Sequence, residues 1–275
     1  MADSSPLVTI VTPSLDQASF LEETISSVRD QDYPCLEHIV IDGGSTDGSL
    51  EIIGRHPQLR WVSEPDRGQA DAVNKGFAMA RGKIFGWLNA DDLYLPGAVA
   101  AAVEALRATG VGLVYGGWQQ IDEGGAVLCD VPPRAWDHDI LRAGQNTIAQ
   151  PAAFFTREAF EAVGGLDPRY HYAMDYDLWL KIAARFEVRA LEQTLAAFRY
   201  HGDSKTVSEA DRFWPETRRI SRRHGGAFFS QPYLDRMADR QPSLFRLTTA
   251  ARLLRSRDFR ELLRRIGGAA PPGGP

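Results

Sequence analysis

Cysteine is scarce in this chain: Cys35 and Cys129 are the two among 275 residues, and their spacing matches no structural metal site. The chain also lacks an apolar run long enough to cross a bilayer. Its first ten residues, MADSSPLVTI, have neither the basic region nor the apolar stretch of a secretion signal. These absences argue against a disulfide-stapled secreted domain and against a membrane-spanning protein. We expect a cytoplasmic globular protein with reduced thiols.

Lysine is missing from residues 211–265, and this segment differs in charge from the rest of the chain. It holds 14 arginines and six acids, a net charge of +8, whereas the whole chain carries −5. Between residues 243 and 266, arginines alternate with leucine, alanine and isoleucine in the pattern of a basic amphipathic helix. Such a helix either lies on an anionic membrane surface or packs on the acidic remainder of the chain. The Gly/Pro-rich residues 267–275 are expected to be disordered, and nucleic acid is not an expected partner because base-reading motifs are absent.

The rest of the chain alternates between strand and helix patterns, which predicts an α/β domain with parallel strands joined by crossover helices. The expected strands are 7–12, 37–42, 60–63, 83–88, 111–116, 152–155 and 196–200. The expected helices are 20–31, 49–53, 69–81, 97–108, 157–163 and 175–185. Residues 122–145 are rich in Gly, Pro and Asp and show weak periodicity, so we expect a loop there.

Four aspartates follow the C-terminal ends of these strands, namely Asp16, Asp42, Asp91 and Asp92. The C-terminal ends of parallel strands lie at one edge of a sheet, so we expect these side chains to share a cleft. Clustered carboxylates repel one another unless a cation or hydrogen-bond donors compensate them. The sequence therefore predicts a metal site and a ligand that the metal can hold.

Three of these aspartates, and Arg67, also have an ordinary structural explanation. Asp91 and Asp92 either chelate Mg²⁺ or Mn²⁺ beside a phosphate or stabilise the turn before a helix that starts near Pro96. Asp42 either accepts hydrogen bonds from a base or ribose or binds the backbone N–H groups of its own turn. Arg67, at a helix start, either meets a phosphate or is a solvated surface residue.

Longer stretches match a known family, and they occur in the family's order. VTPSLDQASFLEETISSVRDQDYP, HIVIDGGSTDGS, SEPDRGQADAVNKGFAMARG and GWLNADDLYLPG resemble the nucleotide-sugar half of a family 2 glycosyltransferase with a GT-A fold. The resemblance continues through IAQPAAFF, YAMDYDLWLKIA and FRYHGDSKT, to about residue 207. It implies a Rossmann-like mixed central sheet flanked by helices. The catalytic domain would be residues 1–208, with a nucleotide-sugar half at about 6–100 and an acceptor half at about 101–208, and 209–275 would form a helical C-terminal extension.

The resemblance also implies roles for individual residues. The positions that match the family's nucleotide-sugar contacts are Pro13, Ser14, Asp16, Asp42, Arg67 and Asp91. Asp91 and Asp92 match the element that holds the sugar diphosphate through Mn²⁺ or Mg²⁺. We expect Asp92 at the metal together with His201, which matches a histidine that approaches the metal or diphosphate in relatives. Asp175 matches the catalytic base.

The chain departs from the family pattern at two positions. Asn89 stands where many relatives carry the first aspartate of D-A-D-D, so the ligand must be Asp91 or Asp92. Met174 stands where a glutamate usually precedes the base, which leaves Asp175 in place. Asp177 is a rival base, but two residues further along a helix it should point to a different face.

Three residues are candidates for the acceptor pocket. We expect Gln150 and Tyr172 to line it. Trp179 either stacks on a sugar ring there or is a core aromatic of an amphipathic helix.

The resulting prediction is an inverting, metal-dependent glycosyltransferase. A sugar hydroxyl is a poor nucleophile, so a carboxylate must take its proton, and a divalent ion stabilises the leaving nucleoside diphosphate. The resemblance implies a uridine- or thymidine-linked donor before a guanosine-linked one. It also implies a glycan or lipid-linked acceptor in bacterial surface polysaccharide assembly, at the inner face of the cell membrane. A non-catalytic nucleotide- or glycan-binding module on the same fold is the alternative.

Overall fold

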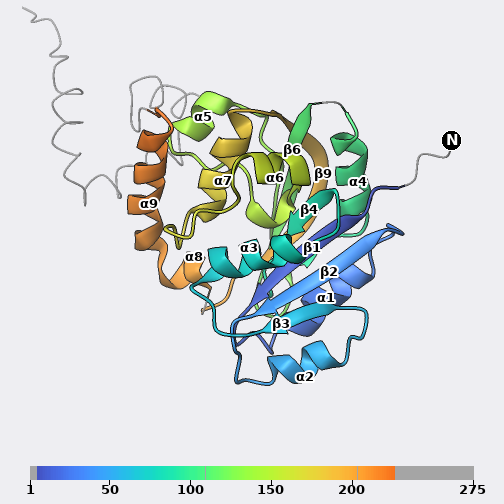
Figure 1. Cartoon of the computed structure of the whole chain (residues 1–275). Coiled ribbons are helices and arrows are strands. Elements are labelled where there is room, and N and C mark those ends of the chain that lie inside the picture. Colours follow the sequence, from blue (N-terminus) through green and yellow to red (C-terminus); the bar gives the residue numbers. More distant parts are fainter. Residues whose placement is uncertain (1–4, 109, 203, 227–275) are drawn as a thin grey trace, which may run out of the picture. The chain divides into compact units, whose positions relative to one another are not determined.

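Figure 1 shows the computed structural model of the chain, which describes residues 5–108, 110–202 and 204–226. The chain divides into two units, residues 1–226 and 227–275, and every described residue lies in the first. The predicted basic helix at 243–266 and the predicted tail at 267–275 lie outside the described residues. Within the described part of the chain, no helix has the length and apolar character needed to span a bilayer.

The described residues form one mixed sheet in the order β3-β2-β1-β4-β8-β6-β9-β5, with β7 paired to β6. The strands are β1 (Val8–Ser14), β2 (Leu36–Asp42), β3 (Arg60–Ser63), β4 (Ile84–Trp87), β5 (Leu93–Tyr94), β6 (Val111–Ile121), β7 (Val127–Val131), β8 (Ala153–Thr156) and β9 (Glu187–Arg199). β3, β2, β1 and β4 run parallel. β8 runs antiparallel between β4 and β6, and the short β5 pairs antiparallel with β9. The four parallel strands therefore end at one edge of the sheet.

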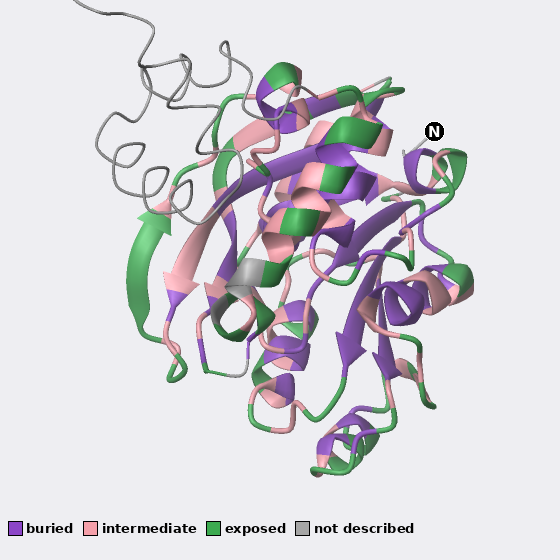
Figure 2. Ribbon diagram, turned by 90° about the vertical axis from the view of Figure 1, so that its left-hand side faces the viewer, coloured by how far each residue is buried: buried purple, intermediate pink, exposed green. Residues whose placement is uncertain are grey.

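Helices cover both faces of this sheet (Figure 1). They are α1 (Leu21–Arg29), α2 (Ser49–Gly54), α3 (Gln69–Met79), α4 (Ala98–Leu106), α5 (His138–Arg142), α6 (Arg157–Ala162), α7 (Met174–Ala183), α8 (Lys205–Ser208) and α9 (Ala210–Arg223), with a 3₁₀ turn at Gln150–Ala152. Successive residues of β8, Phe154 and Phe155, belong to different cores because side chains alternate across a strand. α3, α6 and α7 pack with Phe155, whereas α4 packs with Phe154. Figure 2 shows the buried strands between these layers.

The mixed α/β sheet with flanking helices is confirmed, and the first four predicted strands agree with β1 to β4 within two residues. The prediction of a loop at 122–145 was wrong, because this segment contains β7 and α5. β9 is also longer than predicted and begins at Glu187 rather than at residue 196. Its first half pairs with β6 across register shifts, where a side chain at Gly116 would collide with the carbonyl of Gln193. That pairing is a tertiary contact with no periodic signal in the sequence.

Helix α9 packs on the same body as the sheet. The carboxylate of Glu216 accepts hydrogen bonds from the backbone N–H groups of His171, Tyr172 and Ala173, at 2.8 to 3.1 Å. The described body therefore continues beyond residue 208, where we had placed the domain boundary, and reaches Gly226.

Candidate active site

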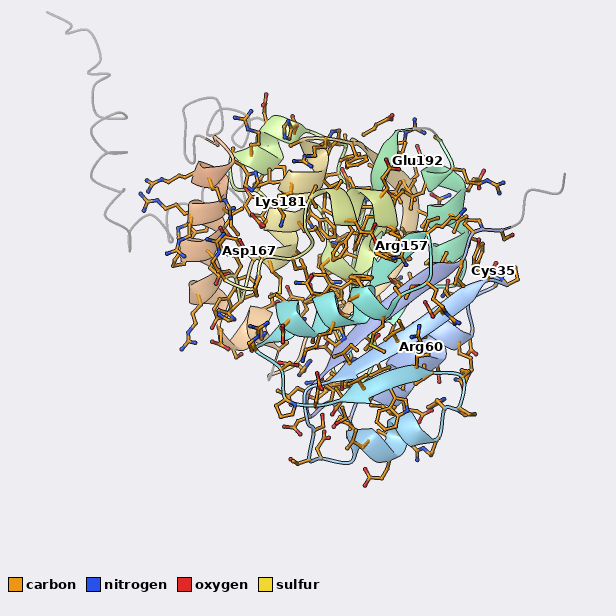
Figure 3. All side chains as sticks on the ribbon, in the orientation of Figure 1. Cys35, Arg60, Arg157, Asp167, Lys181 and Glu192 are labelled. Atoms are coloured by element: carbon orange, nitrogen blue, oxygen red, sulfur yellow. The ribbon has the colours of Figure 1, made fainter. Side chains whose placement is uncertain are left out.

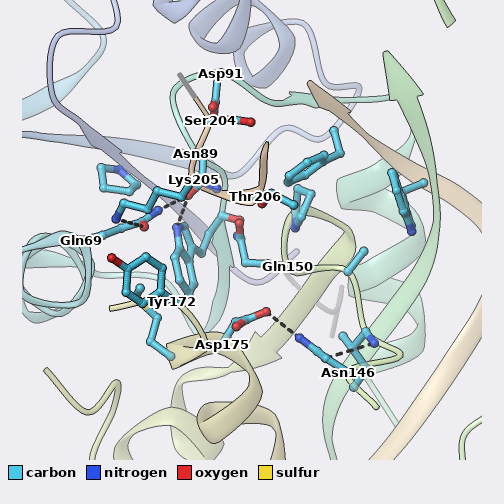
Figure 4. A pocket seen from close by; sticks show the side chains of 18 of the residues that line it. Gln69, Asn89, Asp91, Asn146, Gln150, Tyr172, Asp175, Ser204, Lys205 and Thr206 are labelled. Atoms are coloured by element: carbon cyan, nitrogen blue, oxygen red, sulfur yellow. Dashed lines mark hydrogen bonds between the residues drawn. The ribbon is translucent and has the colours of Figure 1, made fainter. Parts of the chain in front are cut away.

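A cavity of about 720 Å³ opens at the edge where β1 and β4 end. One side, which we call the strand-end wall, consists of residues 13–15, 17, 66, 68, 69 and 89–91. The opposite side, the loop wall, consists of residues 131–134 and 145–151 together with Trp118, Phe198 and Tyr200. Figure 4 shows Asp91 and Asp175 at opposite ends of the group of labelled side chains.

Asp42 lies at this edge, opposite Ser14 in the pairing of β2 with β1, but it does not line the cavity. Its side chain is fully buried. The carboxylate accepts hydrogen bonds from the backbone N–H groups of Gly44 and Ser45, both at 3.0 Å, and from the hydroxyls of Ser45 and Ser63. Because these donors satisfy both oxygens, the structure gives the turn explanation for Asp42 in place of the expected contact with a base.

Pro13 and Ser14 line the cavity as expected, whereas Asp16 and Arg67 do not. The Oγ of Ser14 is buried and has no hydrogen-bond partner within residues 5–226 as described. Asp16 adopts a φ of 51° and accepts a hydrogen bond from the Thr46 N–H at 2.8 Å, which ties the first strand-end loop to the second. The Arg67 side chain is 84% exposed and pairs with Asp71 at 2.9 Å.

Asp91 and Asp92 are neighbours that face opposite environments. Asp91 lines the cavity, and its Oδ2 lies 3.0 Å from Nε2 of the buried His201. Asp92 is 1% exposed and accepts a hydrogen bond from the Arg199 N–H at 3.0 Å. Burial, together with the nearby Asp91 charge, raises the pKa of Asp92 well above its usual range. Asp92, which we expected at a metal together with His201, is buried and does not line the cavity; of the two neighbouring aspartates, Asp91 is the one that lines it and contacts His201.

The Asp91–His201 pair fits a divalent ion that is shared with a phosphorylated ligand. Among the described residues, no group of three or more His, Cys, Asp or Glu side chains lies close enough together to hold a metal alone. Mg²⁺ and Mn²⁺ accept carboxylate and imidazole ligands, and they commonly take their remaining ligands from substrate phosphates and water. Asp91 lines the cavity, whereas His201 is buried, does not line it and contacts Asp91 at 3.0 Å. One carboxylate at the cavity with an imidazole next to it is consistent with that arrangement.

Arg199 fixes the turn that carries Asp91. Its side chain is 1% exposed, and its Nε donates a hydrogen bond to the Asp91 carbonyl at 2.9 Å. Its Nη2 donates to the Glu23 carboxylate at 2.6 Å, and its Nη1 donates to the Glu123 carbonyl at 2.7 Å. One buried guanidinium thus joins the strand-end turn to the segment after β6, which holds the Asp91 carboxylate in the cavity.

Asp175 is the carboxylate on the α7 side of the cavity. It lies in the first turn of α7, is partly buried, and accepts a hydrogen bond from Nδ2 of Asn146 at 2.8 Å (Figure 4). Burial raises its pKa to about 6. A carboxylate with such a pKa is mostly ionised at neutral pH and is a stronger base than an ordinary aspartate.

Asp177 does not line the cavity and is fully buried. It pairs with Lys181 at 3.0 Å and with His224 at 3.1 Å, so it is occupied by structural contacts.

Gln150 and Tyr172 line the cavity, and Trp179 does not. The Tyr172 hydroxyl donates to Glu209 at 2.7 Å, and the Gln150 amide donates to the carbonyl of Trp87. Trp179 is 0% exposed and packs edge-on against Phe155, at 5.7 Å between ring centroids. It is therefore the core aromatic of α7, and stacking of Trp179 on a sugar is excluded.

Residues 9–158 match the family model for Glycosyl transferase family 2, which is more than half of the chain. The chain belongs to this family. An uncharacterized glycosyltransferase of Mycobacterium tuberculosis (strain H37Rv) is 32% identical over 242 residues, which are 84% of this chain and 91% of that protein. The chondroitin synthase of Pasteurella multocida is 28% identical over 213 residues, which are 75% of this chain and 22% of that longer protein.

Solved structures confirm the GT-A fold of this glycosyltransferase. A mannosyltransferase from Pyrobaculum calidifontis, in complex with GDP-Man and Mn²⁺, superposes with a TM-score of 0.59 at 23% identity, covering 94% of this chain and 84% of the other. TarS from S. aureus, residues 1–349 in complex with UDP-GlcNAc, superposes with a TM-score of 0.63 at 13% identity, covering 88% and 76%.

Several residues that line the cavity of this glycosyltransferase were missed by sequence reasoning. On the strand-end wall, Nε2 of Gln69 donates to Asn89 Oδ1 at 2.7 Å, and Nζ of Lys205 donates to Gln69 Oε1 at 3.3 Å (Figure 4). The missed residues of the loop wall are Trp118, Arg134, Asn146, Phe198 and Tyr200. Gln69 and Asn89 lie within the matched family segments and so had a signal, whereas residues 131–134 lie in the stretch that we interpreted as a featureless loop.

Proposed function

We propose that this glycosyltransferase is an inverting, metal-dependent enzyme that moves a sugar from a nucleotide-sugar donor to a hydroxyl of a glycan or lipid-linked saccharide. The observation that carries the proposal is the position of Asp175. It is a carboxylate of raised pKa on the same cavity as Asp91, which contacts His201. A base and a diphosphate site on one cavity are the two parts that direct sugar transfer requires.

The strand-end wall is the proposed donor site. Pro13, Ser14 and Gln69 would contact the nucleoside, and the buried, unpartnered Ser14 hydroxyl supports a polar contact there. Relatives with the same fold bind GDP-Man in one case and UDP-GlcNAc in another. Asp42, which is buried beneath this wall, would orient its turn rather than touch the base.

Asp91 and His201 are the proposed metal ligands. A bound Mn²⁺ or Mg²⁺ would stabilise the negative charge that grows on the departing diphosphate. Arg199 would keep the Asp91 carboxylate in position, because its side chain donates to the Asp91 carbonyl and its backbone N–H donates to the carboxylate of the next residue, Asp92.

In the proposed reaction, Asp175 accepts the proton of the acceptor hydroxyl while the hydroxyl oxygen attacks the anomeric carbon. The bond between that carbon and the nucleoside diphosphate breaks on the opposite side, so the configuration inverts. Asn146 keeps one oxygen of Asp175 hydrogen-bonded, which orients the other. General base catalysis of this kind contributes a factor of about 10²–10⁴ in rate.

We further propose that the enzyme acts in a bacterial surface polysaccharide pathway, at the inner face of the cell membrane. Two observations support this proposal: a curated relative is a chondroitin synthase, and residues 211–265 are rich in arginine. An anionic membrane surface attracts such a segment.

The first experiment is a thermal-shift screen of nucleotide sugars with Mn²⁺, because a ligand that binds the folded form raises the melting temperature. The best donor is then assayed for turnover with Mn²⁺ and with EDTA. We expect activity with Mn²⁺ and its loss in chelator. Full activity in EDTA would remove the metal from the proposal, and the absence of both donor binding and donor turnover would contradict the proposed function.

A further inference from the structure

The loop wall carries a row of aromatic rings. Trp118 lies on β6, Phe198 on β9 and Tyr200 directly after β9, and all three line the cavity. The Trp118 and Phe198 ring centroids are 5.8 Å apart, and those of Phe198 and Tyr200 are 5.3 Å apart, both in edge-to-face contact. Rings that brace one another on adjacent strands form a fixed apolar surface, which suits the flat face of a sugar ring.

The segment next to this row is held rigidly. Pro132 and Pro133 restrict its backbone, and Pro133 lies so close to Gly117 that a side chain there would be crowded. The hydroxyl of Tyr115 donates a hydrogen bond to the carbonyl of Arg134 at 2.7 Å. Tyr115 is fully buried, so the donor of this bond has a set position in the core. The backbone of Arg134 is therefore pinned to the wall.

The side chain of Arg134 lines the cavity and is exposed. No carboxylate within the described residues 5–226 forms an ion pair with its guanidinium. Most arginines of the described residues are paired with an acid, as Arg60 (labelled in Figure 3) and Arg81 are with Glu37. An unpaired guanidinium that extends from an anchored backbone into a cavity is a ready site for a carboxylate or phosphate.

A second long cationic side chain that lines the cavity, Lys205, contacts the opposite wall. Lys205 bonds to Gln69 on the strand-end wall, where the donor diphosphate is proposed to lie. Arg134 belongs to the loop wall, together with the aromatic row and Asn146, the hydrogen-bond partner of Asp175. The anion that Arg134 would meet therefore belongs to the acceptor rather than to the donor.

We propose that the acceptor is an acidic saccharide, whose ring packs on Trp118, Phe198 and Tyr200 while its carboxylate or phosphate pairs with Arg134. The proposal rests on the proposed function, since it assigns the second substrate of that reaction. It adds a selection for charge that an aromatic surface alone does not provide, because a neutral sugar leaves the guanidinium in water.

The test measures binding of three simple probes by NMR titration in the presence of UDP and Mn²⁺. They are the methyl glycoside of glucose, the methyl glycoside of glucuronic acid, and the methyl glycoside of glucose 6-phosphate. We expect at least one anionic probe to bind about tenfold more tightly than the neutral one, as a charge-assisted hydrogen bond to Arg134 predicts. Comparison of the two anionic probes separates a uronate from a phosphate source. Equal binding of all three would overturn the proposal.

Variants locate the effect. Arg134→Gln should reduce the preference for the anionic probe to about one, whereas Arg219→Gln, an equal change of charge on the exposed surface of α9, should leave it unchanged. Trp118→Ala should weaken all three probes alike, because it removes ring contact and not charge. Retention of the preference in Arg134→Gln would also overturn the proposal.

Donor-only measurements separate this proposal from the proposed function. UDP affinity and donor hydrolysis without acceptor should be the same in Arg134→Gln and in the unaltered enzyme. A loss of UDP affinity in Arg134→Gln would assign Arg134 to the donor and overturn the acidic-acceptor proposal alone. Donor hydrolysis that is absent from the unaltered enzyme counts against the proposed function instead.

Discussion

The two walls of the cavity are built in different ways. The strand-end wall consists of short turns at the ends of β1 and β4 and at the start of α3, all of which belong to the parallel part of the sheet and its crossover helices. The loop wall gathers segments from β6, β7, β9 and the residues before α7, which meet through antiparallel and long-range pairing. The first wall is a direct product of parallel α/β topology, whereas the second depends on specific contacts such as the bond from Tyr115 to Arg134. We expect the strand-end wall to bind what all members of the family share and the loop wall to select the acceptor.

Among the substitutions that test this difference between the two walls, the largest expected effect is on turnover, at Asp175. Asp175→Asn should lower turnover by about 10²–10⁴, because the acceptor hydroxyl loses its base. UDP affinity should stay nearly unchanged, because the proposed donor contacts lie on the strand-end wall, which does not include Asp175. Kinetics and UDP titration of the same preparation measure both quantities, and a loss of UDP binding would place Asp175 in the donor site.

The matched control is Asp177→Asn, two residues further along α7. It breaks a buried cluster with Lys181 and His224, so it should lower the melting temperature. Turnover per folded molecule should remain close to that of the unaltered enzyme.

The second effect concerns the neighbours Asp91 and Asp92. Asp91→Asn should weaken Mn²⁺ binding in the presence of UDP by at least about tenfold, as expected for a lost contact at a metal. Asp92→Asn should have a smaller effect, because that side chain contacts the Arg199 N–H rather than the cavity. Electron paramagnetic resonance of free Mn²⁺ measures both affinities, and the reverse order would restore Asp92 as the ligand.

The smallest effect is a dependence on pH that follows from the pKa of Asp175, which is about 6. Activity should fall about tenfold per pH unit below this value and level off above it, because only the ionised form accepts a proton.

The raised pKa also means that the folded state favours the protonated form, so stability from this group is lost as pH rises through about 6. Asp175→Asn should therefore be more stable than the unaltered enzyme at pH 8, by at most about 3 kcal/mol. Thermal unfolding at pH 5 and pH 8 checks the sign.

The sheet edge that carries the strand-end wall could be predicted from sequence, because hydrophobic periodicity and turn residues encode the strand ends locally. The side chains that line the wall were predicted only in part, since Asp16 and Arg67 do not line the cavity and Gln69 was missed. Which of two neighbouring acids faces the cavity could not be predicted in this way. The buried Asp92 carboxylate accepts a hydrogen bond from the backbone N–H of Arg199, which lies 107 positions further along the chain. The Asp177 carboxylate pairs with the imidazole of His224, which lies 47 positions away. The loop wall was largely missed, because residues 131–134 form no periodic pattern and owe their position to Tyr115 and to the pairing of β6 with β7.

The contacts of Arg199 set a limit on how freely the two walls can be recombined. A chimaera that takes everything after residue 100 from another family member would replace Arg199 but keep Glu23, Asp91 and Asp92 from this chain. Without an arginine at the end of the incoming strand, Glu23 would lose its ion pair and the Asp91 carbonyl its donor. Grafting a new acceptor specificity onto this donor site therefore requires that the seam be moved or that this one side chain be carried across it.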